Sequence, residues 1–210
     1  MTTIAMIGAG NVGGNLGARL SKAGAPVRFG VREGADAREA LARCADDAEA
    51  LPVREAAAAA DVIFVAVPGG VAIEAAKGLG DVSGKVVVDC TNPLRFDGGP
   101  VWTPPAEGSN AAAIAAALEG ARVLKGFNTF GAELHADPAL SAGPVDVQLA
   151  GDDAEAKAMV SELAERAGFR PIDAGTLRNA AVLENLAVLW IHLALVGGHG
   201  REVGFKLVGR

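Results

Sequence analysis

A run of glycines near the start of the chain has the spacing of a phosphate-binding turn. From Gly8 to Gly13 the chain reads Gly-Ala-Gly-Asn-Val-Gly, directly after a short apolar segment. In this pattern Gly8 permits a tight turn, Gly10 lets the backbone approach a pyrophosphate, and Gly13 lets helix and strand pack closely. The N-terminus of the following helix would bind the phosphates. The pattern predicts a dinucleotide site, and a tight turn in a chain of 28 glycines is the alternative.

The residues after the second predicted strand favour NADP over NAD. An NAD-binding protein carries an acidic side chain at the tip of this strand, where it binds the ribose 2′-hydroxyl. Here Gly30 or Val31 takes that place, and Arg32 follows with a guanidinium group suited to the 2′-phosphate of NADP. Glu33 comes next and weakens this interpretation, and a solvated surface arginine is the alternative for Arg32.

Residues for acid–base or metal chemistry are scarce. The chain has no tyrosine, which excludes a Tyr–Lys proton donor, and its three histidines lack partners at metal-ligand spacing: His135, His192 and His199. We interpret each histidine as structural, predict no metal site, and leave the catalytic residues unassigned. Hydride transfer to an acceptor that is itself a redox cofactor would need little acid–base help.

The elements that must position these residues alternate between strand and helix. Apolar segments predict strands at 3–7, 27–31, 62–67, 85–89, 122–127, 146–150 and 170–173. Helices are predicted at 11–23, 35–45, 71–77, 110–118 and 152–167, with a long apolar helix over 177–196 and a Gly- and Pro-rich loop over 94–109. The alternation predicts an α/β fold: a Rossmann-type doubly wound, mainly parallel sheet with helices on both faces and a C-terminal helical appendage.

Length and composition fit one α/β domain with a short extension. The 210 residues are 50% apolar and 21% charged, which favours a packed core over disorder. We expect a dinucleotide-binding Rossmann domain over 1–175, and a C-terminal helix and tail over 176–210 that pack on it. The two cysteines, Cys44 and Cys90, are interpreted as small buried residues rather than as a disulfide or metal framework.

Charge and hydropathy limit the partners. A net charge of −6 argues against nucleic acid or an anionic membrane. We find no signal-peptide pattern and no uninterrupted apolar run of about 18 residues, so we expect a cytoplasmic protein. The long apolar helix would serve in the core or in a dimer contact, which leaves a homodimer open.

Several separate segments together resemble one known family. They are residues 7–14, 29–32, 125–132, 173–180 and the tail 204–207. Over essentially its whole length the chain resembles the NADPH-dependent deazaflavin (coenzyme F420) reductases and their bacterial relatives. It is also similar to the cytosolic domain of the vertebrate metalloreductases of the STEAP type, which pairs NADPH with a flavin. The resemblance implies NADP(H) as one cofactor, with coenzyme F420, FMN or FAD as the second redox partner.

The resemblance also implies where the cofactors bind. The pyrophosphate would lie over the glycine turn, the 2′-phosphate at the end of the second strand, and the nicotinamide among three strand ends. The second ring would lie near 128–132 and the start of the last helix. The cofactor-binding residues predicted in this way are Gly8, Ala9, Gly10, Asn11, Val12, Gly13, Val31, Arg32, Val67, Pro68, Gly69, Thr91, Asn92, Pro93, Asn128, Thr129 and Ala132.

The chain also departs from the family pattern. Many relatives have serine where this chain has Val31, and a bulky aromatic residue is common where it has Gly69. The archaeal enzymes carry His-Thr-Ile-Pro at 128–131, where this chain reads Asn-Thr-Phe-Gly. These changes would open room for a different second substrate.

Three functions fit the sequence. The first is hydride exchange between NADPH and a deazaflavin or flavin. The second is NADPH-dependent reduction of a small carbonyl or imine, for which Asn128, His135 or a water would have to donate the proton. The third is a non-catalytic NADP(H)-binding sensor. In each case the partner is a redox cofactor or a small molecule.

Overall fold

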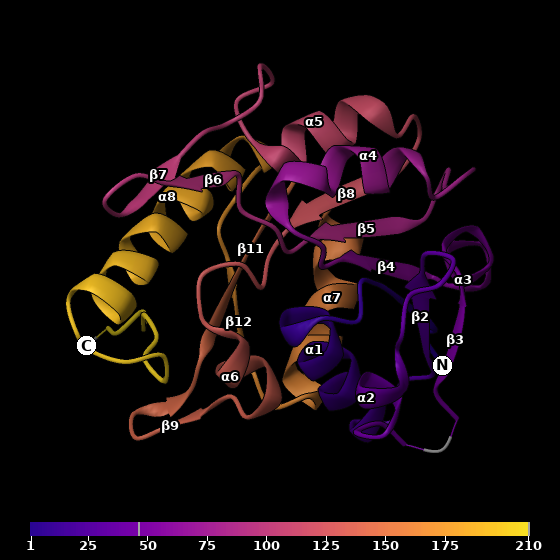
Figure 1. Ribbon diagram of the computed structural model, residues 1–210, viewed down its shortest axis with the longest axis horizontal. Coiled ribbons are helices and arrows are strands. Elements are labelled where there is room, and N and C mark those ends of the chain that lie inside the picture. The colour runs from indigo at the N-terminus through magenta and orange to yellow at the C-terminus, as the bar shows by residue number, and fades with distance from the viewer. Residues whose placement is uncertain (46, 210) are drawn as a thin grey trace.

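The chain folds around one twisted β-sheet with helices on both faces (Figure 1). The computed structural model describes residues 1–45 and 47–209. Within these residues the main sheet has eight strands in the order β12-β11-β8-β5-β4-β1-β2-β3. Neighbouring strands run parallel except β8 and β11, which are antiparallel. The predicted Rossmann-type, mainly parallel α/β fold with a C-terminal helix is confirmed.

The elements have the following bounds. The strands of the main sheet are β1 Ile4–Ile7, β2 Val27–Val31, β3 Glu49–Pro52, β4 Val62–Val65, β5 Val86–Asp89, β8 Arg122–Lys125, β11 Asp146–Gly151 and β12 Arg170–Asp173. The α-helices are α1 Asn11–Lys22, α2 Arg38–Leu41, α3 Val53–Ala59, α4 Ala72–Lys77, α5 Asn110–Ala117, α6 Ala132–Ala136, α7 Ala154–Arg166 and α8 Ala180–Ile191. Two small hairpins join β6 Leu94–Phe96 to β7 Pro100–Trp102, and β9 Ala139–Leu140 to β10 Gly143–Pro144.

The central strands are apolar throughout because both faces of the sheet are covered. In β4, Val62 and Phe64 belong to the core beneath α1 and α7, and Ile63 and Val65 to the core beneath α3, α4 and α5. Side chains alternate along a strand, so one uninterrupted apolar segment supplies both cores.

The order of the strands fixes where a ligand can bind. From β1 the chain passes through α1 to β2 on one side, and β4 and β5 lie on the other side of β1. Such a reversal leaves a crevice outside the carboxyl ends of the strands, and dinucleotides bind across it. The glycine turn at 8–10 lies at this point, between β1 and α1.

Two predicted elements differ from the structure. Residues 94–102, predicted as part of a loop, form the β6–β7 hairpin, whose turn includes Gly98 in the left-handed region at φ 68°. The helix predicted over 35–45 is reduced to α2, because the N–H groups of Arg43 and Cys44 bond to carbonyls three residues back. The prediction that both cysteines are buried is wrong for Cys44, which is half-buried, and is confirmed for Cys90.

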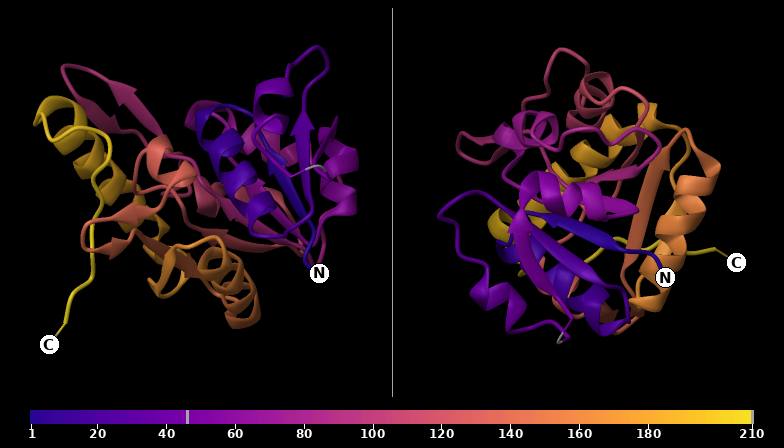
Figure 2. Two further views of the ribbon diagram at one scale, coloured as in Figure 1. Left: turned by 90° about the horizontal axis from the view of Figure 1, so that it is seen from below. Right: turned by 90° about the vertical axis from the view of Figure 1, so that its right-hand side faces the viewer.

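The C-terminal helix runs beside the β6–β7 hairpin (Figure 2). Its whole helical stretch, Leu177–Val196, is long and apolar enough to cross a membrane by length and composition alone, and 33% of its apolar window is buried inside the protein. Leu183, Glu184 and Trp190 face the protein, while Val182 and Leu189 are exposed. The division of the chain near residue 175, the homodimer and the cytoplasmic location all stay predictions.

A buried carboxylate fastens the tail to the edge of the sheet. Asp146 of β11 accepts hydrogen bonds from Arg170 (Nε, 2.7 Å), from Lys206 (Nζ, 3.0 Å) and from the backbone N–H of Leu207 (2.7 Å). Burial by itself raises the pKa of Asp146. The hydrogen bonds from these donors lower it by more, so the pKa of Asp146 lies below its ordinary value. The tail motif at 204–207 is therefore held by one ionised side chain.

This geometry predicts a pH-dependent stability. Because the folded-state pKa of Asp146 is depressed, its contribution is present above the unfolded-state pKa of about 3.9 and is lost as the pH falls through the folded pKa. We expect Asp146→Asn to have a lower free energy of unfolding at pH 7 and to differ less from the natural protein at pH 3. Urea denaturation at both pH values measures this. A difference that stayed constant with pH would contradict the prediction.

Candidate functional site

The glycine turn forms an open cradle at the start of α1. Gly8 has φ 105°, and a Cβ atom on Gly13 would collide with the carbonyl oxygen of Gly8. Gly10 is the N-cap of α1 and forms no side-chain cap hydrogen bond. A Cβ on Gly10 would meet no atom within 4 Å. The N-terminal N–H groups of α1 thus face open space without a capping side chain, as a bound pyrophosphate requires.

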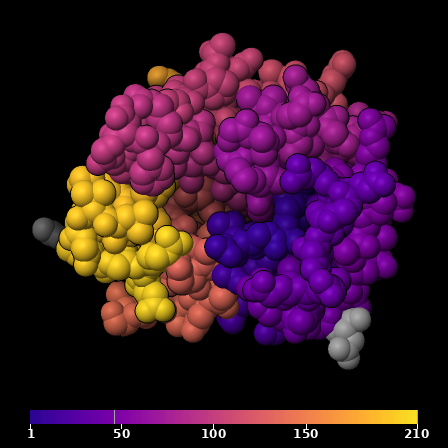
Figure 3. Space-filling view, in the orientation of Figure 1, coloured from indigo at the N-terminus to yellow at the C-terminus, as the bar shows by residue number. Residues whose placement is uncertain are grey.

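A hollow lies at this end of α1. Figure 3 shows it bordered by the N-terminal part of the chain (indigo), the middle segments (magenta) and the C-terminal region (yellow). The predicted site residues Ala9, Asn11 and Val12 belong to the turn and the first turn of α1, and they are half-buried or exposed. The hollow therefore lies where the strand order predicts a ligand crevice.

Arg32 stands at the end of β2 without a partner among the described residues. Its side chain is exposed and forms no hydrogen bond or ion pair with them, whereas nearby Arg38 pairs with Asp36 (2.7 Å). Gly30 is opposite Ile7 in the register, and a Cβ on Gly30 would lie 2.6 Å from the Ile7 side chain. A side chain at Gly30 would have to displace the end of the Ile7 side chain, and the free guanidinium of Arg32 suits a phosphate.

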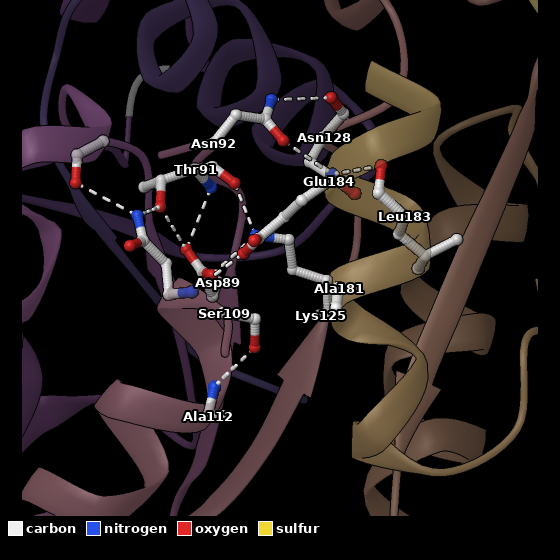
Figure 4. A network of polar contacts seen from close by, with 12 residues as sticks. Asp89, Thr91, Asn92, Ser109, Ala112, Lys125, Asn128, Ala181, Leu183 and Glu184 are labelled. Atoms are coloured by element: carbon white, nitrogen blue, oxygen red, sulfur yellow. Dashed lines mark hydrogen bonds and ion pairs between the residues drawn. The ribbon is translucent and has the colours of Figure 1, made fainter. Parts of the chain in front are cut away.

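On the other side of the crevice, two strand ends are clamped together (Figure 4). Asn92 Nδ2 donates to the carbonyl of Asn128 (2.9 Å), and Asn128 Nδ2 donates to Asn92 Oδ1 (2.8 Å) and to the carbonyl of Leu183 (3.1 Å). The two backbone acceptors fix the orientation of both amides. Asn128 Oδ1 is buried and has no hydrogen-bond partner among the described residues, so it is a free acceptor at this edge.

Asn110 ties the other predicted segments together. Its Nδ2 donates to the carbonyl of Gly69 (3.0 Å) and to Thr91 Oγ1 (2.8 Å). Val67 and Pro68 precede Gly69 after β4, and Pro93 accepts from the N–H of Thr103 (2.8 Å). The structure thus brings together the segments after β4, β5 and β8, which the sequence analysis assigned to the nicotinamide.

The turn after β8 is fixed by a buried histidine. Phe127 has φ 57°, the only positive φ of a non-glycine residue in the described part of the chain. The two ring nitrogens of His135 lie 2.9 Å from the carbonyl oxygens of Gly131 (Nδ1) and Phe127 (Nε2), and the nitrogen that carries the hydrogen donates to its carbonyl. Burial lowers the pKa of His135, although these bonds act in the opposite direction. Its contacts agree with the predicted structural role.

Two further predicted residues serve the packing of this region. Thr129 Oγ1 donates to Gln148 Oε1 (2.7 Å), so its hydroxyl is engaged by β11. Ala132 begins α6, and its carbonyl accepts from Asn15 Nδ2 of α1 (2.7 Å). These contacts hold α6 against the helix that begins at the glycine turn.

Behind the clamped strand ends lies an ion network that the sequence analysis missed (Figure 4). Lys125 Nζ donates to Asp89 Oδ2 (2.7 Å), to Glu184 Oε1 (2.9 Å) and to the carbonyl of Thr91. All three charged side chains are fully buried. The available signals were a lysine at the end of an apolar strand and a single acid within an apolar helix.

Gly69 offers a test of how tightly this edge is packed. A methyl group on Gly69 would overlap the backbone carbonyl of Asn92. The space that a larger side chain would fill is therefore already occupied by the chain itself. We expect Gly69→Ala to displace the Asn92 loop, to destabilise the protein by about 1–3 kcal/mol and to weaken NADPH binding.

Its matched control is Gly70→Ala. A Cβ on Gly70 would meet no atom within 4 Å, so we expect stability and NADPH affinity to stay close to those of the natural protein. Thermal unfolding and fluorescence titration with NADPH measure both effects. Equal behaviour of the two variants would show that the Gly69–Asn92 contact does not constrain the site.

The site has the parts of a dinucleotide site rather than of a metal centre. In the segments 1–45 and 47–209, no group of three His, Cys, Asp or Glu side chains could hold a metal ion. The uncapped helix N-terminus at Gly10, the free Arg32 and the polar groups after β4, β5 and β8 instead suit a phosphorylated dinucleotide.

Comparisons with known proteins agree with this geometry. Residues 3–93 match the family described as NADP oxidoreductase, coenzyme F420-dependent. The chain is 35% identical, over 89% of its length and 89% of the relative's, to the F420-dependent NADP reductase of Methanothermobacter marburgensis.

Two other matches extend the comparison. A crystal structure of a putative F420-dependent NADP reductase from Arthrobacter sp. FB24 superposes with a TM-score of 0.88, covers 100% of both chains and is 29% identical. The metalloreductase STEAP3 of Rattus norvegicus is 31% identical over 86% of this chain, which corresponds to 35% of the longer metalloreductase.

Proposed function

The chain belongs to the family of coenzyme F420-dependent NADP oxidoreductases, and we propose that it transfers a hydride between NADPH and a deazaflavin or flavin. Its class, an NADP-dependent oxidoreductase, follows from that membership. NADP(H) supplies the hydride from its nicotinamide ring. The chain's own residues bind the dinucleotide through the turn at Gly10 and through Arg32, and they shape the edge formed by Asn92 and Asn128.

One observation supports this choice of acceptor: the side chains near the site that could donate a proton are already engaged by other groups of the protein. His135 is fully buried, and both of its ring nitrogens lie 2.9 Å from backbone carbonyls, so neither faces a ligand. The hydroxyl of Thr129 is occupied by Gln148. A conjugated ring acceptor can spread the incoming charge over its own atoms and take its proton from water, so it needs no acid from the protein.

The same observation weighs against a carbonyl or imine reductase. That reaction needs a proton donor beside the developing alkoxide or amine. His135 is fully buried. Asn128 is a poor acid, and its Nδ2 is engaged by Asn92 Oδ1 and by the carbonyl of Leu183. A sensor without activity does not fit membership of an oxidoreductase family.

The experiment is an anaerobic absorbance assay of NADPH oxidation with coenzyme F420, FMN and FAD as separate acceptors. We expect sustained oxidation with at least one of them, and faster oxidation with NADPH than with NADH. Binding of NADPH without oxidation by any of the three would overturn the proposal. The acceptor would then be sought among small carbonyls and imines with the same assay.

A further inference from the structure

We propose that the buried cluster Asp89–Lys125–Glu184 carries a net negative charge that favours NADP⁺ over NADPH in the bound state, with Glu184 as the residue that supplies the excess charge. The inference rests on NADP(H) binding and on the placement of the nicotinamide half at the ends of β4 and β5. It does not depend on which acceptor takes the hydride.

The hydrogen-bond partners of Asp89 show that it is ionised. Asp89 Oδ1 accepts from the backbone N–H of Thr91 (2.9 Å) and from Thr91 Oγ1 (2.7 Å), and Oδ2 accepts from Lys125 Nζ (2.7 Å). Thr91 Oγ1 also accepts from Asn110 Nδ2, and its hydroxyl donates to Asp89 Oδ1. Both oxygens of Asp89 therefore face donors, and one of these donors is an ammonium group, as an ionised carboxylate requires.

Glu184 is ionised for the same reason. Its Oε1 accepts from Lys125 Nζ (2.9 Å) and from the backbone N–H of Asn110 (2.9 Å), and its Oε2 accepts from Trp102 Nε1 (3.0 Å). All of these groups are donors, and Asn110 is the first residue of α5, where a carboxylate is stabilised by the helix N-terminus. Two carboxylates and one ammonium group therefore leave one unit of negative charge in the cluster.

This charge lies directly behind the predicted nicotinamide pocket. Asp89 and Lys125 end β5 and β8, and the site residues Thr91, Asn92 and Asn128 follow within three residues. In a fold with this strand order the dinucleotide crosses the crevice from α1, so its halves lie on opposite sides of β1. Arg32 marks the adenosine half at the end of β2, which leaves β4 and β5 to the nicotinamide half.

The charge distinguishes the two oxidation states of the ring. When the C4–H bond breaks and the hydride leaves with its electron pair, the neutral dihydropyridine becomes a pyridinium with one positive charge. A fixed negative charge attracts only the oxidised ring, and burial of all three side chains keeps water from screening it. The cluster thereby makes bound NADPH a stronger hydride donor.

A purely structural ion pair would not require Glu184. Lys125 is already neutralised by Asp89, and the second carboxylate comes from α8, far away in the sequence. Glu184 also holds Trp102 of the β6–β7 hairpin, so the excess charge is enclosed by the hairpin and the C-terminal helix. The arrangement places charge beyond what pairing the lysine needs.

The test is the ratio of the dissociation constants of NADP⁺ and NADPH, measured by calorimetric or fluorescence titration without any acceptor. For Glu184→Gln we expect the dissociation constant of NADP⁺ divided by that of NADPH to rise on the order of tenfold, because the oxidised ring loses an attractive charge. This is the effect of one unit charge at about 10 Å in a medium of effective dielectric constant about 20. Asp89→Asn removes the same single negative charge, so it replaces Glu184→Gln in this test, with the same expected result, if Glu184→Gln does not fold.

Two further variants separate charge from structure. The double variant Lys125→Met, Glu184→Gln again carries one net negative charge, from Asp89, and should restore most of the natural ratio. Trp102→Phe removes a hydrogen bond to Glu184 and leaves every charge in place, so its ratio should not change. A structural role would instead move both dissociation constants together in every variant.

An unchanged ratio in a folded Glu184→Gln, or an equal shift in the double variant, would overturn the inference. These outcomes are distinct from failure of the proposed function. Lack of NADPH oxidation by F420, FMN and FAD would reject the acceptor, while a shifted binding ratio would still establish the role of the charge.

Discussion

Lys125→Met is expected to lower the free energy of unfolding by about 3–5 kcal/mol, the cost of removing one partner from a buried ion pair. The methionine would fill the space of the lysine stem but would leave Asp89 and Glu184 as two fully buried carboxylates facing each other. The carbonyl of Thr91 would lose its donor as well. Urea denaturation of the protein without cofactor measures the change.

A surface ion pair provides the control for this prediction. Lys157 bonds to Asp173 (2.8 Å), whose side chain is 67% exposed. We expect Lys157→Met to change the free energy of unfolding by about 1 kcal/mol or less. Adding Glu184→Gln to Lys125→Met should recover part of the loss, because the excess carboxylate is then removed. A loss in Lys125→Met no larger than in Lys157→Met would contradict the buried network.

Arg32→Ala is expected to weaken NADPH binding by about 1.5–3 kcal/mol, the usual size of a hydrogen bond to a charged group. NADH lacks the 2′-phosphate, so its affinity should barely change. The free, exposed position of Arg32 at the end of β2 is the basis of this expectation. Fluorescence titration with both nucleotides measures the two affinities.

Arg38→Ala is the matched control. Arg38 lies six residues further along, is also exposed, and is already paired with Asp36. Its loss should leave the affinities for NADPH and NADH almost unchanged. Equal weakening of both nucleotides in Arg32→Ala would refute the assignment of Arg32 to the 2′-phosphate.

Residues beyond the segment that matches the family description complete the site. Lys125, Asn128 and Glu184 all lie after residue 93, and they close the edge that begins with Gly69 and Asn92. The C-terminal helix is therefore part of the site's construction and not only a cover for the sheet. Its Glu184 contacts Lys125, the last residue of β8, and its Leu183 carbonyl accepts from Asn128 in the turn after β8.

The sequence by itself determined the fold class, and it predicted where a dinucleotide would bind. The turn from Gly8 to Gly13 and the apolar segment of β4 are local patterns, since a tight turn, a helix start and a buried strand depend on neighbouring residues. The role of Arg32 as a phosphate ligand is predicted in the same way, from its place after β2. The β6–β7 hairpin and the shortened α2 were misread because their strands and helix are only three or four residues long.

Only the tertiary structure decided how the strand ends meet. The Asn92–Asn128 clamp joins residues 36 positions apart, and the Lys125–Glu184 pair joins residues 59 apart. No local pattern specifies such partners, because a buried charge is tolerated only where distant segments supply its hydrogen bonds. Gly69 is a second example. A glycine in place of a bulky residue predicts open space from the sequence, but in the fold the backbone carbonyl of Asn92 occupies that space.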